Sequence, residues 1–419
     1  MSVATSPTLA INEQLQARQA AGEPVLHLGF GEAGLPVLPE VAERLGRAAR
    51  RAEYAPVAGT PAALRAAAGY FTRRGLPTGP DQVVLAPGSK ALLYALIACL
   101  PGDLVLPGPS WVSYAAQAAL AGKRVRRVPV PEEAGGVPDP DLLDDALRLA
   151  RRQGGRPGTL LLTIPDNPTG TVADPDLVRR VCAVAEAHDL VVVSDEIYRD
   201  LCYDPHDLVS PSHFVPDRCF VTTGLSKSMA LGGWRIGCAR LPDNELGARV
   251  HRDVVGLASE VWSSLARPML DVAAYVFDEP PEVVDHVAAG RSLHQAVATA
   301  VHRAFVDHGA RCRPPRAAFY VYPDLDPQRE LLGRQGIGSG ADLARHLLDA
   351  HGVGVLPGEA FGDDPTALRF RVATSLLYGR TDGERWAALR ADDPLTLPWI
   401  DDALTRLRAA LAALTTVAV

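Results

Sequence analysis

The sequence predicts an α/β protein with two domains, and two observations carry that prediction. Between residues 82 and 241, short β-branched runs alternate with stretches of helical periodicity, which is the pattern of successive βαβ units. From about residue 256 the pattern changes to one long helical stretch followed by shorter strand-like runs. We therefore expect a three-layer αβα large domain with a mostly parallel seven-stranded sheet, and a smaller α+β domain packed against it.

The expected elements follow one another along the chain. The strands of the large sheet are predicted at 82–86, 103–106, 125–130, 159–164, 190–194, 218–223 and 236–241. Helices are predicted between them at 90–99, 113–121, 139–151 and 175–188. The small domain is expected to hold a helix at 281–307, strand-like runs at 317–322, 353–356 and 368–373, and a last helix at 398–414. This places an N-terminal arm that joins the small domain at 1–45, the large domain at 46–275 and the small domain at 276–419.

Composition narrows the class of protein. The 419 residues carry a net charge of −7, so no strong basic field favours nucleic-acid binding. The six cysteines are scattered without metal-type spacing, which indicates reduced thiols and no metal site. The N-terminus shows no basic region followed by an apolar core, and no apolar run reaches membrane-spanning length. We expect a cytoplasmic protein without a nucleic-acid or membrane partner.

Several reactive or polar residues fall at the ends of the predicted strands. Parallel sheets bind ligands at the carboxyl ends of their strands. The residues concerned are Gly88 and Ser89 after the first strand, Trp111 after the second, Asn167 after the fourth, Asp195 after the fifth and Lys227 after the sixth. Their convergence predicts one binding site at this edge of the sheet.

Lys227 lies eight residues before Arg235, in a glycine-bearing turn that leads into an apolar strand. Lysine is rare in this chain, since Lys90, Lys123 and Lys227 are the three among 42 basic residues. A Schiff base needs a primary amine that can lose its proton and attack a carbonyl, which arginine cannot do. The turn is therefore compatible with imine chemistry at Lys227, although a lysine taken alone would be interpreted as a surface lysine before a helix or strand.

Residues 226–237 resemble the cofactor-lysine signature of fold-type I pyridoxal-phosphate enzymes, specifically the class I/II aminotransferase superfamily. The resemblance extends over about residues 29–376. It implies that Lys227 holds pyridoxal 5'-phosphate (PLP) as an internal aldimine, while Ser226 and Arg235 bind the cofactor phosphate. A phosphate dianion suits a fork of charged donors and a short hydroxyl.

The resemblance also implies roles for two residues that follow the apolar run 190–193. Asp195 would pair with the pyridine nitrogen, and Tyr198 would donate to the phenolic oxygen of the cofactor. A carboxylate beside the ring nitrogen keeps it protonated, so that the ring can accept electrons from a substrate carbanion. Taken alone, Asp195 would be interpreted as the N-cap of a helix.

Two turns resemble further family motifs. In residues 164–170 the implied role of Asn167 is to contact the phenolic oxygen and the substrate carboxylate, although Asn-Pro and Thr-Gly form turns in any protein. Asp166 stands where the family usually has a neutral polar residue. In residues 87–92, Gly88, Ser89 and Lys90 would form an anion site at a helix start for the cofactor phosphate, mainly through backbone donors. An ordinary capped helix is the alternative.

Three other segments carry implied contacts. Trp111 would stack on the pyridine face, with a core tryptophan as the alternative. Tyr54 would reach the cofactor phosphate of the neighbouring subunit, which implies a homodimer with shared active sites; a loop tyrosine on the surface is the alternative. Gly31 would let the backbone approach the substrate in a lid segment, although Ala33 and Gly34 replace the Pro-Asp pair of the family and a glycine-rich turn without a ligand is the alternative.

Residues 368–374 resemble the family's Arg-Leu-Ser-Tyr-Ala strand. The resemblance implies that Arg369 clamps the substrate α-carboxylate. Arg371 stands where serine is common, and strand alternation places it on the same face as Arg369, so it would add a cation near the substrate or pair with a structural carboxylate. The register also permits Arg371 as the clamp, but the spacing to Ala373 and Thr374 favours Arg369.

The resemblance implies an enzyme that acts on an α-amino acid. In the first hypothesis it is an aminotransferase, with Lys227 as the general base that moves the amino group to a 2-oxo acid. In the second it is a secondary-metabolism enzyme that performs elimination or replacement, cyclisation, C–C bond formation or oxidation. The departures from the family motifs and the long segment 378–397 motivate the second hypothesis. A non-enzymatic PLP-binding regulator is a remote third hypothesis. Such regulators carry an added DNA-binding domain, and the fewer than thirty residues before Gly29 are too few for one.

Overall fold

A computed structural model of the chain describes residues 5–415. Its centre is a seven-stranded sheet in the order β2-β8-β7-β6-β5-β3-β4. Strand β8 runs antiparallel to β2 and β7, and the other neighbouring pairs are parallel. The strands are β2 (Val83–Pro87), β3 (Asp103–Gly108), β4 (Val125–Pro129), β5 (Pro157–Thr163), β6 (Val191–Asp195), β7 (Cys219–Gly224) and β8 (Ile236–Arg240). The predicted seven-stranded, mostly parallel sheet is confirmed.

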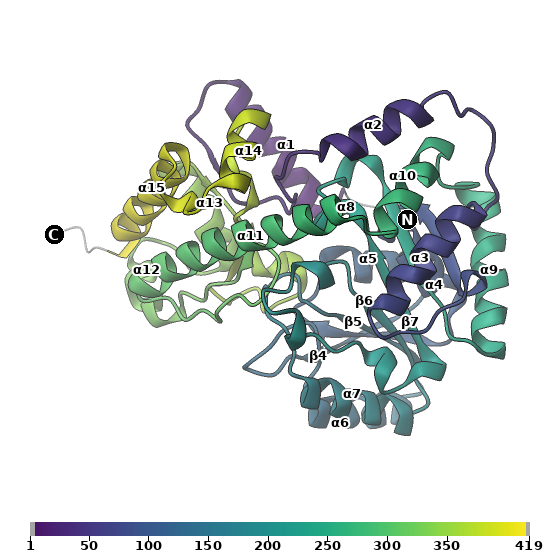
Figure 1. Cartoon of the computed structure of the whole chain (residues 1–419). Helices are drawn as coiled ribbons and strands as arrows, with labels where there is room; N and C mark the ends of the chain where they lie inside the picture. The colour runs from purple at the N-terminus through teal and green to yellow at the C-terminus, as the bar shows by residue number, and fades with distance from the viewer. Residues whose placement is uncertain (1–4, 416–419) are drawn as a thin grey trace.

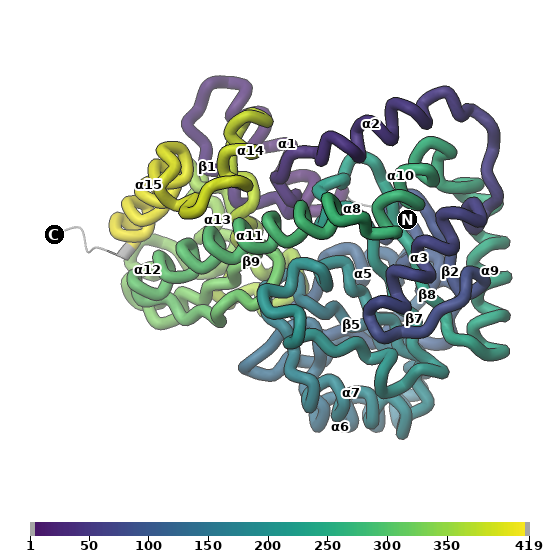
Figure 2. The backbone as a smooth tube through the Cα atoms, viewed as in Figure 1, coloured from purple at the N-terminus to yellow at the C-terminus, as the bar shows by residue number. Residues whose placement is uncertain are grey.

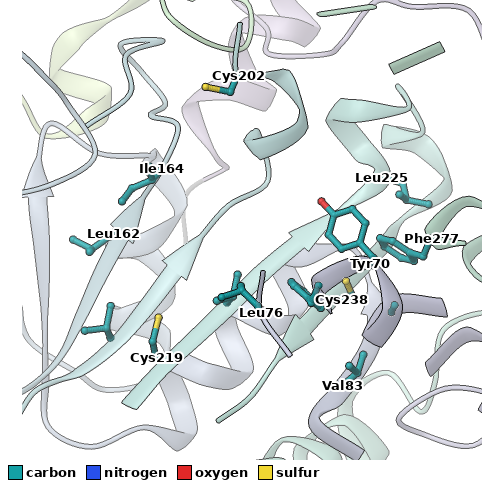
Figure 3. Packing of buried hydrophobic residues seen from close by; sticks show 14 of the residues in the cluster. Tyr70, Leu76, Val83, Leu162, Ile164, Cys202, Cys219, Leu225, Cys238 and Phe277 are labelled. Carbon is teal, nitrogen blue, oxygen red and sulfur yellow. The ribbon is translucent and has the colours of Figure 1, made fainter. Parts of the chain in front are cut away.

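Helices cover both faces of this sheet, as its uninterrupted apolar strands require. On β5, Leu160 and Leu162 belong to one buried cluster, whereas Leu161 between them belongs to another. The first cluster, part of which is shown in Figure 3, packs under α3 (Pro61–Arg73), α6 (Pro140–Arg152), α7 (Pro175–Ala187) and α10 (Arg267–Phe277). The second packs under α4 (Ser89–Cys99), α5 (Val112–Leu120) and α9 (Glu245–Val261). The three-layer prediction is therefore confirmed.

A long helix, α11 (Pro281–Asp307), links this part to the C-terminal part (Figure 1). Val283 near its start packs in the core of the large sheet, whereas Leu293 and Phe305 pack in a separate core. That second core is built from α12 (Arg329–Arg334), α13 (Gly340–His351), α15 (Pro398–Thr415) and a small sheet of β11 (Leu356–Pro357), β12 (Phe370–Ala373) and β9 (Tyr320–Val321). The domain boundaries at 45 and 275 stay a prediction.

The start of the N-terminal segment lies against the C-terminal part of the chain, and its last helix packs on α10. It contains α1 (Pro7–Ala20), β1 (Leu26–His27) and α2 (Pro39–Ala48). Strand β1 pairs in parallel with β10 (Val353–Gly354), and Figure 2 shows this purple stretch running beside the yellow C-terminal helices. Leu26 and Leu28 join the second core, while Val41 on α2 joins the first.

The segment 378–397, expected from sequence to be a long connection, contains a helix. This helix, α14 (Asp382–Arg390), starts with a capping box in which the Thr381 side chain accepts from the Glu384 backbone N–H and Glu384 accepts from the Thr381 N–H. The Thr-x-x-Glu spacing is the sequence signal for such a start. Within residues 5–415, no helix is long and apolar enough to cross a lipid bilayer.

Leu162 tests the packing of the first core. Its side chain is fully buried, so we expect Leu162→Ala to lower the free energy of unfolding by about 2–5 kcal/mol. Leu142 on α6 is 45% exposed, and Leu142→Ala is the matched control. Urea unfolding of the two variants and the parent checks this, and equal losses in both variants would contradict the assigned packing.

Candidate active site

A cavity of about 530 Å³ lies at the carboxyl ends of β5, β6 and β7. The elements that meet there come from the N-terminal segment, the large sheet and the small sheet. The cavity is lined by Thr8, Leu9, Phe30, Gly31, Glu32, Ser89, Lys90, Trp111, Tyr114, Thr163, Asn167, Asp195, Ile197, Tyr198, Ser226, Lys227, Gly232, Gly233, Arg235, Tyr320 and Arg371. Most of the residues predicted from sequence to form one site therefore do lie together.

Lys227 lies on the short helix α8 (Leu225–Ser228), which directly follows β7. Its Nζ donates a hydrogen bond to the Gly31 carbonyl oxygen. Burial, together with the nearby positive charge of Arg371, lowers the pKa of Lys227 from its ordinary value to about 8. The amine can therefore lose its proton near neutral pH, which is the property that a nucleophile and base requires.

Asp195 ends β6 in the depth of the cavity. One carboxylate oxygen accepts a hydrogen bond from the Tyr114 hydroxyl at 2.8 Å, and the other accepts one from Thr222 at 3.2 Å. Burial raises the pKa of Asp195 to about 6, although these hydrogen bonds oppose the rise. A cation placed against this carboxylate would be strongly favoured, because it would offset the cost of burying the charge.

A chain of hydrogen bonds joins four side chains on one wall. The Tyr198 and Tyr320 hydroxyl oxygens are 2.8 Å apart, and Asn167 Nδ2 donates to the Tyr198 hydroxyl at 3.3 Å. The Asn167 Oδ1 accepts from Arg371 at 3.0 Å. Asn167 is therefore held at both ends of its amide, between a phenol and a guanidinium.

Arg371, and not Arg369, reaches this cavity. Arg371 is 1% exposed and donates to Asn167 and to the Gly29 carbonyl oxygen at 2.9 Å. Its guanidinium carbon also lies 4.8 Å from the centre of the Tyr320 ring. Arg369 is outside the cavity, where it pairs with Asp324 and Asp363 at 3.2 Å each.

The prediction of Arg369 as the substrate clamp is therefore wrong in its placement. Arg369 directly precedes strand β12 and bridges Asp324 in the register of the β12–β9 pairing, so its ion pairs with Asp324 and Asp363, and not its place in the strand, hold it outside the cavity. The aspartates that neutralise Arg369 come from residues 324 and 363, distant in sequence from each other. Spacing to Ala373 alone could not reveal these partners.

The residues predicted to bind a phosphate lie at one end of the cavity. Gly88 has φ +83°, and a Cβ there would fall 2.2 Å from an Arg235 guanidinium nitrogen, so only glycine leaves room for this arginine. Lys90 is half-buried, and burial together with the neighbouring charge of Arg235 lowers its pKa. Ser89 opens α4, whose free backbone N–H groups add to these cations to favour a bound anion.

Two other predicted residues fall in different surroundings. The Trp111 ring lines the cavity and meets the Tyr114 ring edge-on at 5.1 Å. Tyr54 is 94% exposed and does not line the cavity. Because its expected contact is with another subunit, the role of Tyr54 stays a prediction.

Asp166 and Gly31 determine the course of the backbone next to the site. The Asp166 carboxylate is buried and accepts from the Thr169 hydroxyl at 2.6 Å, outside the cavity. Burial raises its pKa to about 6, and we assign it to holding the turn that carries Asn167. Gly31 is close to Tyr320, since a Cβ there would lie 2.3 Å from its hydroxyl oxygen.

Sequence reasoning missed Tyr114, Tyr320 and the N-terminal helix as parts of the site. Tyr114 lies three residues after Trp111, on the first turn of α5, so helical spacing from a strand end was an available signal. Tyr320 lies on β9 in the small sheet and Thr8 on α1. Neither has a local motif, and the fold alone brings them to the cavity.

These groups fit pyridoxal phosphate. The cavity holds a buried amine at Lys227, an anion cradle at Arg235, and a buried carboxylate at Asp195 that favours a protonated ring nitrogen. The Arg371 Nε is buried and has no hydrogen-bond partner within the described residues, as expected where an anionic ligand group completes its contacts. The fold and the site thus define a PLP enzyme in which Arg371 offers a second anion-binding position, apart from the phosphate position at Arg235.

Comparison with known proteins identifies the family. Residues 23–376 match the family model described as aminotransferase class I and II. A bifunctional aspartate and glutamate/aspartate-prephenate aminotransferase of Petunia hybrida is 33% identical over 90% of this chain and 78% of its own length. The aspartate aminotransferase of Geobacillus stearothermophilus is 30% identical over 92% of this chain and 96% of its own.

Solved structures agree with the sequence matches. The Thermus thermophilus aspartate aminotransferase with maleate superposes with a TM-score of 0.82 at 25% identity, covering 97% of both chains. The chain belongs to the class I and II aminotransferases. It is a PLP-dependent aminotransferase.

The lowered pKa of Lys227 has a kinetic consequence. The neutral amine attacks the cofactor aldehyde, so we expect the rate at which cofactor-free protein takes up pyridoxal phosphate to rise with pH and to level off above about 8. A free lysine side chain, titrating near 10.4, continues to accelerate beyond that pH. Stopped-flow absorbance measures the rate, and the control is free lysine whose α-amino group is blocked, so that only its side-chain amine reacts. A rate that still rises between roughly pH 9 and 10 would contradict the assignment.

Proposed function

We propose that this enzyme removes the amino group of an α-amino acid at Lys227 and holds the substrate carboxylate at Arg371. The observation that carries this proposal is the placement of a buried amine and a buried, incompletely bonded guanidinium in one cavity. When bound, pyridoxal phosphate supplies the aldehyde that captures the amine and the ring that accepts the electron pair of the broken α C–H bond.

Each side chain has a defined part in this proposal. Arg371 binds the substrate carboxylate, and Asn167 orients it through its hydrogen bond with Arg371. Lys227 Nζ takes the α-proton as general base, since a pKa of about 8 leaves about a fifth of the amine neutral near physiological pH, far more than an ordinary lysine has. Asp195 keeps a proton on the ring nitrogen through charge pairing, and Tyr198 donates to the phenolic oxygen.

The residues around Arg235 hold the cofactor in place. Arg235, Ser226 and the backbone start of α4 hold the cofactor phosphate, because a charged fork and backbone N–H groups bind a dianion well. Trp111 limits the tilt of the ring by stacking on its face. Fixing the ring fixes which substrate bond lies perpendicular to it, and hence which bond breaks.

The relatives support aspartate as the first amino acid to test, because their names give aspartate as a substrate. Lys90 adds support, since its ammonium group lies 5.1 Å from the centre of the Trp111 ring inside the cavity. A cation there suits a second carboxylate on the substrate. Transfer of the amino group to a 2-oxo acid completes the cycle.

Two chains would build each active site in this proposal. Tyr54 is exposed on a single chain. The backbone next to it is tied to α10, because the preceding residue, Glu53, pairs with Arg267. An exposed tyrosine hydroxyl could donate to a phosphate on the neighbouring subunit. We also propose a reducing compartment, the cytoplasm, since all six cysteines are free thiols.

Transamination is tested directly by half-reactions. We expect the holoenzyme, mixed with aspartate in the absence of an oxo acid, to lose its visible imine absorbance and to release oxaloacetate. Adding 2-oxoglutarate then restores the absorbance. Spectra with mass spectrometry of the products measure both steps. Consumption of the amino acid by another route, with no amino form of the cofactor from any of the common amino acids, would contradict the proposal.

Arg371 and Arg369 give a matched pair of variants. Arg371→Lys keeps the charge but loses the planar fork, so we expect kcat/KM to fall by roughly 10- to 150-fold, the equivalent of about 1.5–3 kcal/mol. Arg369→Lys lies outside the cavity and should change kcat/KM by less than about threefold. Steady-state kinetics on both variants check this. A larger loss for Arg369→Lys than for Arg371→Lys would overturn the assignment of the clamp.

A further inference from the structure

A second cavity, of about 700 Å³, lies beside the first, between α1, α14, α15 and the segment that contains β1. Its volume is within the range of small-molecule sites. Figure 1 shows α1 and α14 next to each other at this position. The cavity is lined by Asn12, Gln16, Gln19, Val25, Leu26, His27, Glu32, Leu376, Leu377, Gly379, Arg380, Glu384, Arg385, Trp399, Asp402, Ala403 and Arg406.

Most of one wall lies beyond the part of the chain that matches the family model. The match ends at residue 376, and α14 and α15 come after it. Residues 378–397, which contain α14, are also longer than a simple connection needs. The proposed transamination uses none of these residues, so their arrangement around a cavity calls for a separate explanation.

The charges on the wall are balanced but not paired with one another. Within residues 5–415, no ion pair joins any two of the six charged side chains that line the cavity. The three cationic and three anionic side chains are Arg380, Arg385, Arg406, Glu32, Glu384 and Asp402. Such a wall offers both hydrogen-bond donors to a carboxylate and acceptors to an ammonium group.

Several of these groups keep unused capacity. Arg406 donates from one Nη to the Pro24 carbonyl oxygen at 2.6 Å, and Arg385 donates from Nε to the Gly379 carbonyl oxygen at 3.2 Å. Arg385 also pairs with Asp382 at 4.0 Å. A guanidinium has five N–H donors, so within residues 5–415 both arginines keep donors that could bind an anion. Glu384 accepts backbone N–H groups through Oε2, which leaves Oε1 available.

The rest of the lining suits a small polar molecule. Asn12, Gln16 and Gln19 present amides from successive turns of α1. The Trp399 indole N–H donates to the Tyr378 carbonyl oxygen at 3.0 Å, which fixes the ring as an apolar side of the cavity. We propose that this cavity is a second binding site, distinct from the transamination site, and that it takes a zwitterionic amino acid.

Two elements connect this cavity to the transamination site. Thr8 and Leu9 of α1 line the first cavity, whereas Asn12 and Gln16 of the same helix line the second. Glu32 lines both, and it adjoins Gly31, whose carbonyl oxygen accepts from Lys227.

Calorimetry and absorbance separate the two sites in the holoenzyme. Each of the twenty common amino acids is titrated in parallel while the heat and the visible spectrum of the bound cofactor are recorded. Binding at the transamination site changes both signals, whereas binding at the second site changes the heat alone. We expect at least one amino acid to give a saturable heat phase without a matching absorbance change, with Kd below roughly 10 mM.

A double variant assigns that heat phase to the cavity. Arg380 and Asp402 have exposed side chains on the cavity wall, so Arg380→Gln with Asp402→Asn should leave folding and the absorbance titration unchanged. We expect it to weaken the heat-only phase at least about tenfold. Asp401→Asn with Arg408→Gln alters two exposed residues of α15 outside the cavity and should change neither signal.

Two results would overturn the proposal. One is that heat and absorbance saturate together at one ligand per chain, or that no heat is detected, for all twenty amino acids. The other is a heat-only phase that the Arg380→Gln, Asp402→Asn variant leaves unaltered. Neither result bears on transamination itself, which the half-reactions test separately.

Discussion

The structure of the active site depends on burying two cations, Lys227 and Arg371, in one cavity where, within residues 5–415, no ion pair joins either of them to a carboxylate. Burial lowers the pKa of both side chains, and each is stabilised by neutral oxygens. The carbonyl oxygens of Gly31 and Gly29 accept from Lys227 and Arg371 respectively. Backbone and amide oxygens solvate a cation without cancelling its charge, so the charge stays available to a ligand.

This constraint explains why distant segments must meet. Residues 29–31 from the N-terminal segment supply the carbonyls, β12 supplies Arg371, and α8 supplies Lys227. Asn167 on the large sheet bonds Arg371 on the small sheet. The two parts of the chain are therefore joined at the site by hydrogen bonds to buried charges. A shift between them would expose or unpair these charges, which is costly.

The class of fold and much of the site could be predicted from the sequence, and the reason is local. Strands β5, β6 and β7 are apolar runs of five to seven residues, and the residues that directly follow them share one edge of a parallel sheet. Asn167, Asp195 and Lys227 could be placed together on that basis alone. The family resemblance assigned Gly88 and Arg235 to the same phosphate, and the structure brings them together because the end of β2 pairs with the start of β8, Pro87 with Ile236.

Arg369 shows where that reasoning ends. Two arginines separated by one residue look equivalent in a strand, but Asp324 and Asp363 neutralise the first arginine outside the cavity. Tyr320 and the residues of α1 reach the cavity through contacts across the chain that have no local pattern. Sequence by itself determined the elements and the chemistry at the strand ends, because hydrophobic periodicity and turn residues act over a few positions. Only the tertiary structure decided that Arg371 faces the cavity while Arg369 pairs with aspartates outside it, since burial and ion pairing depend on residues far away in the sequence.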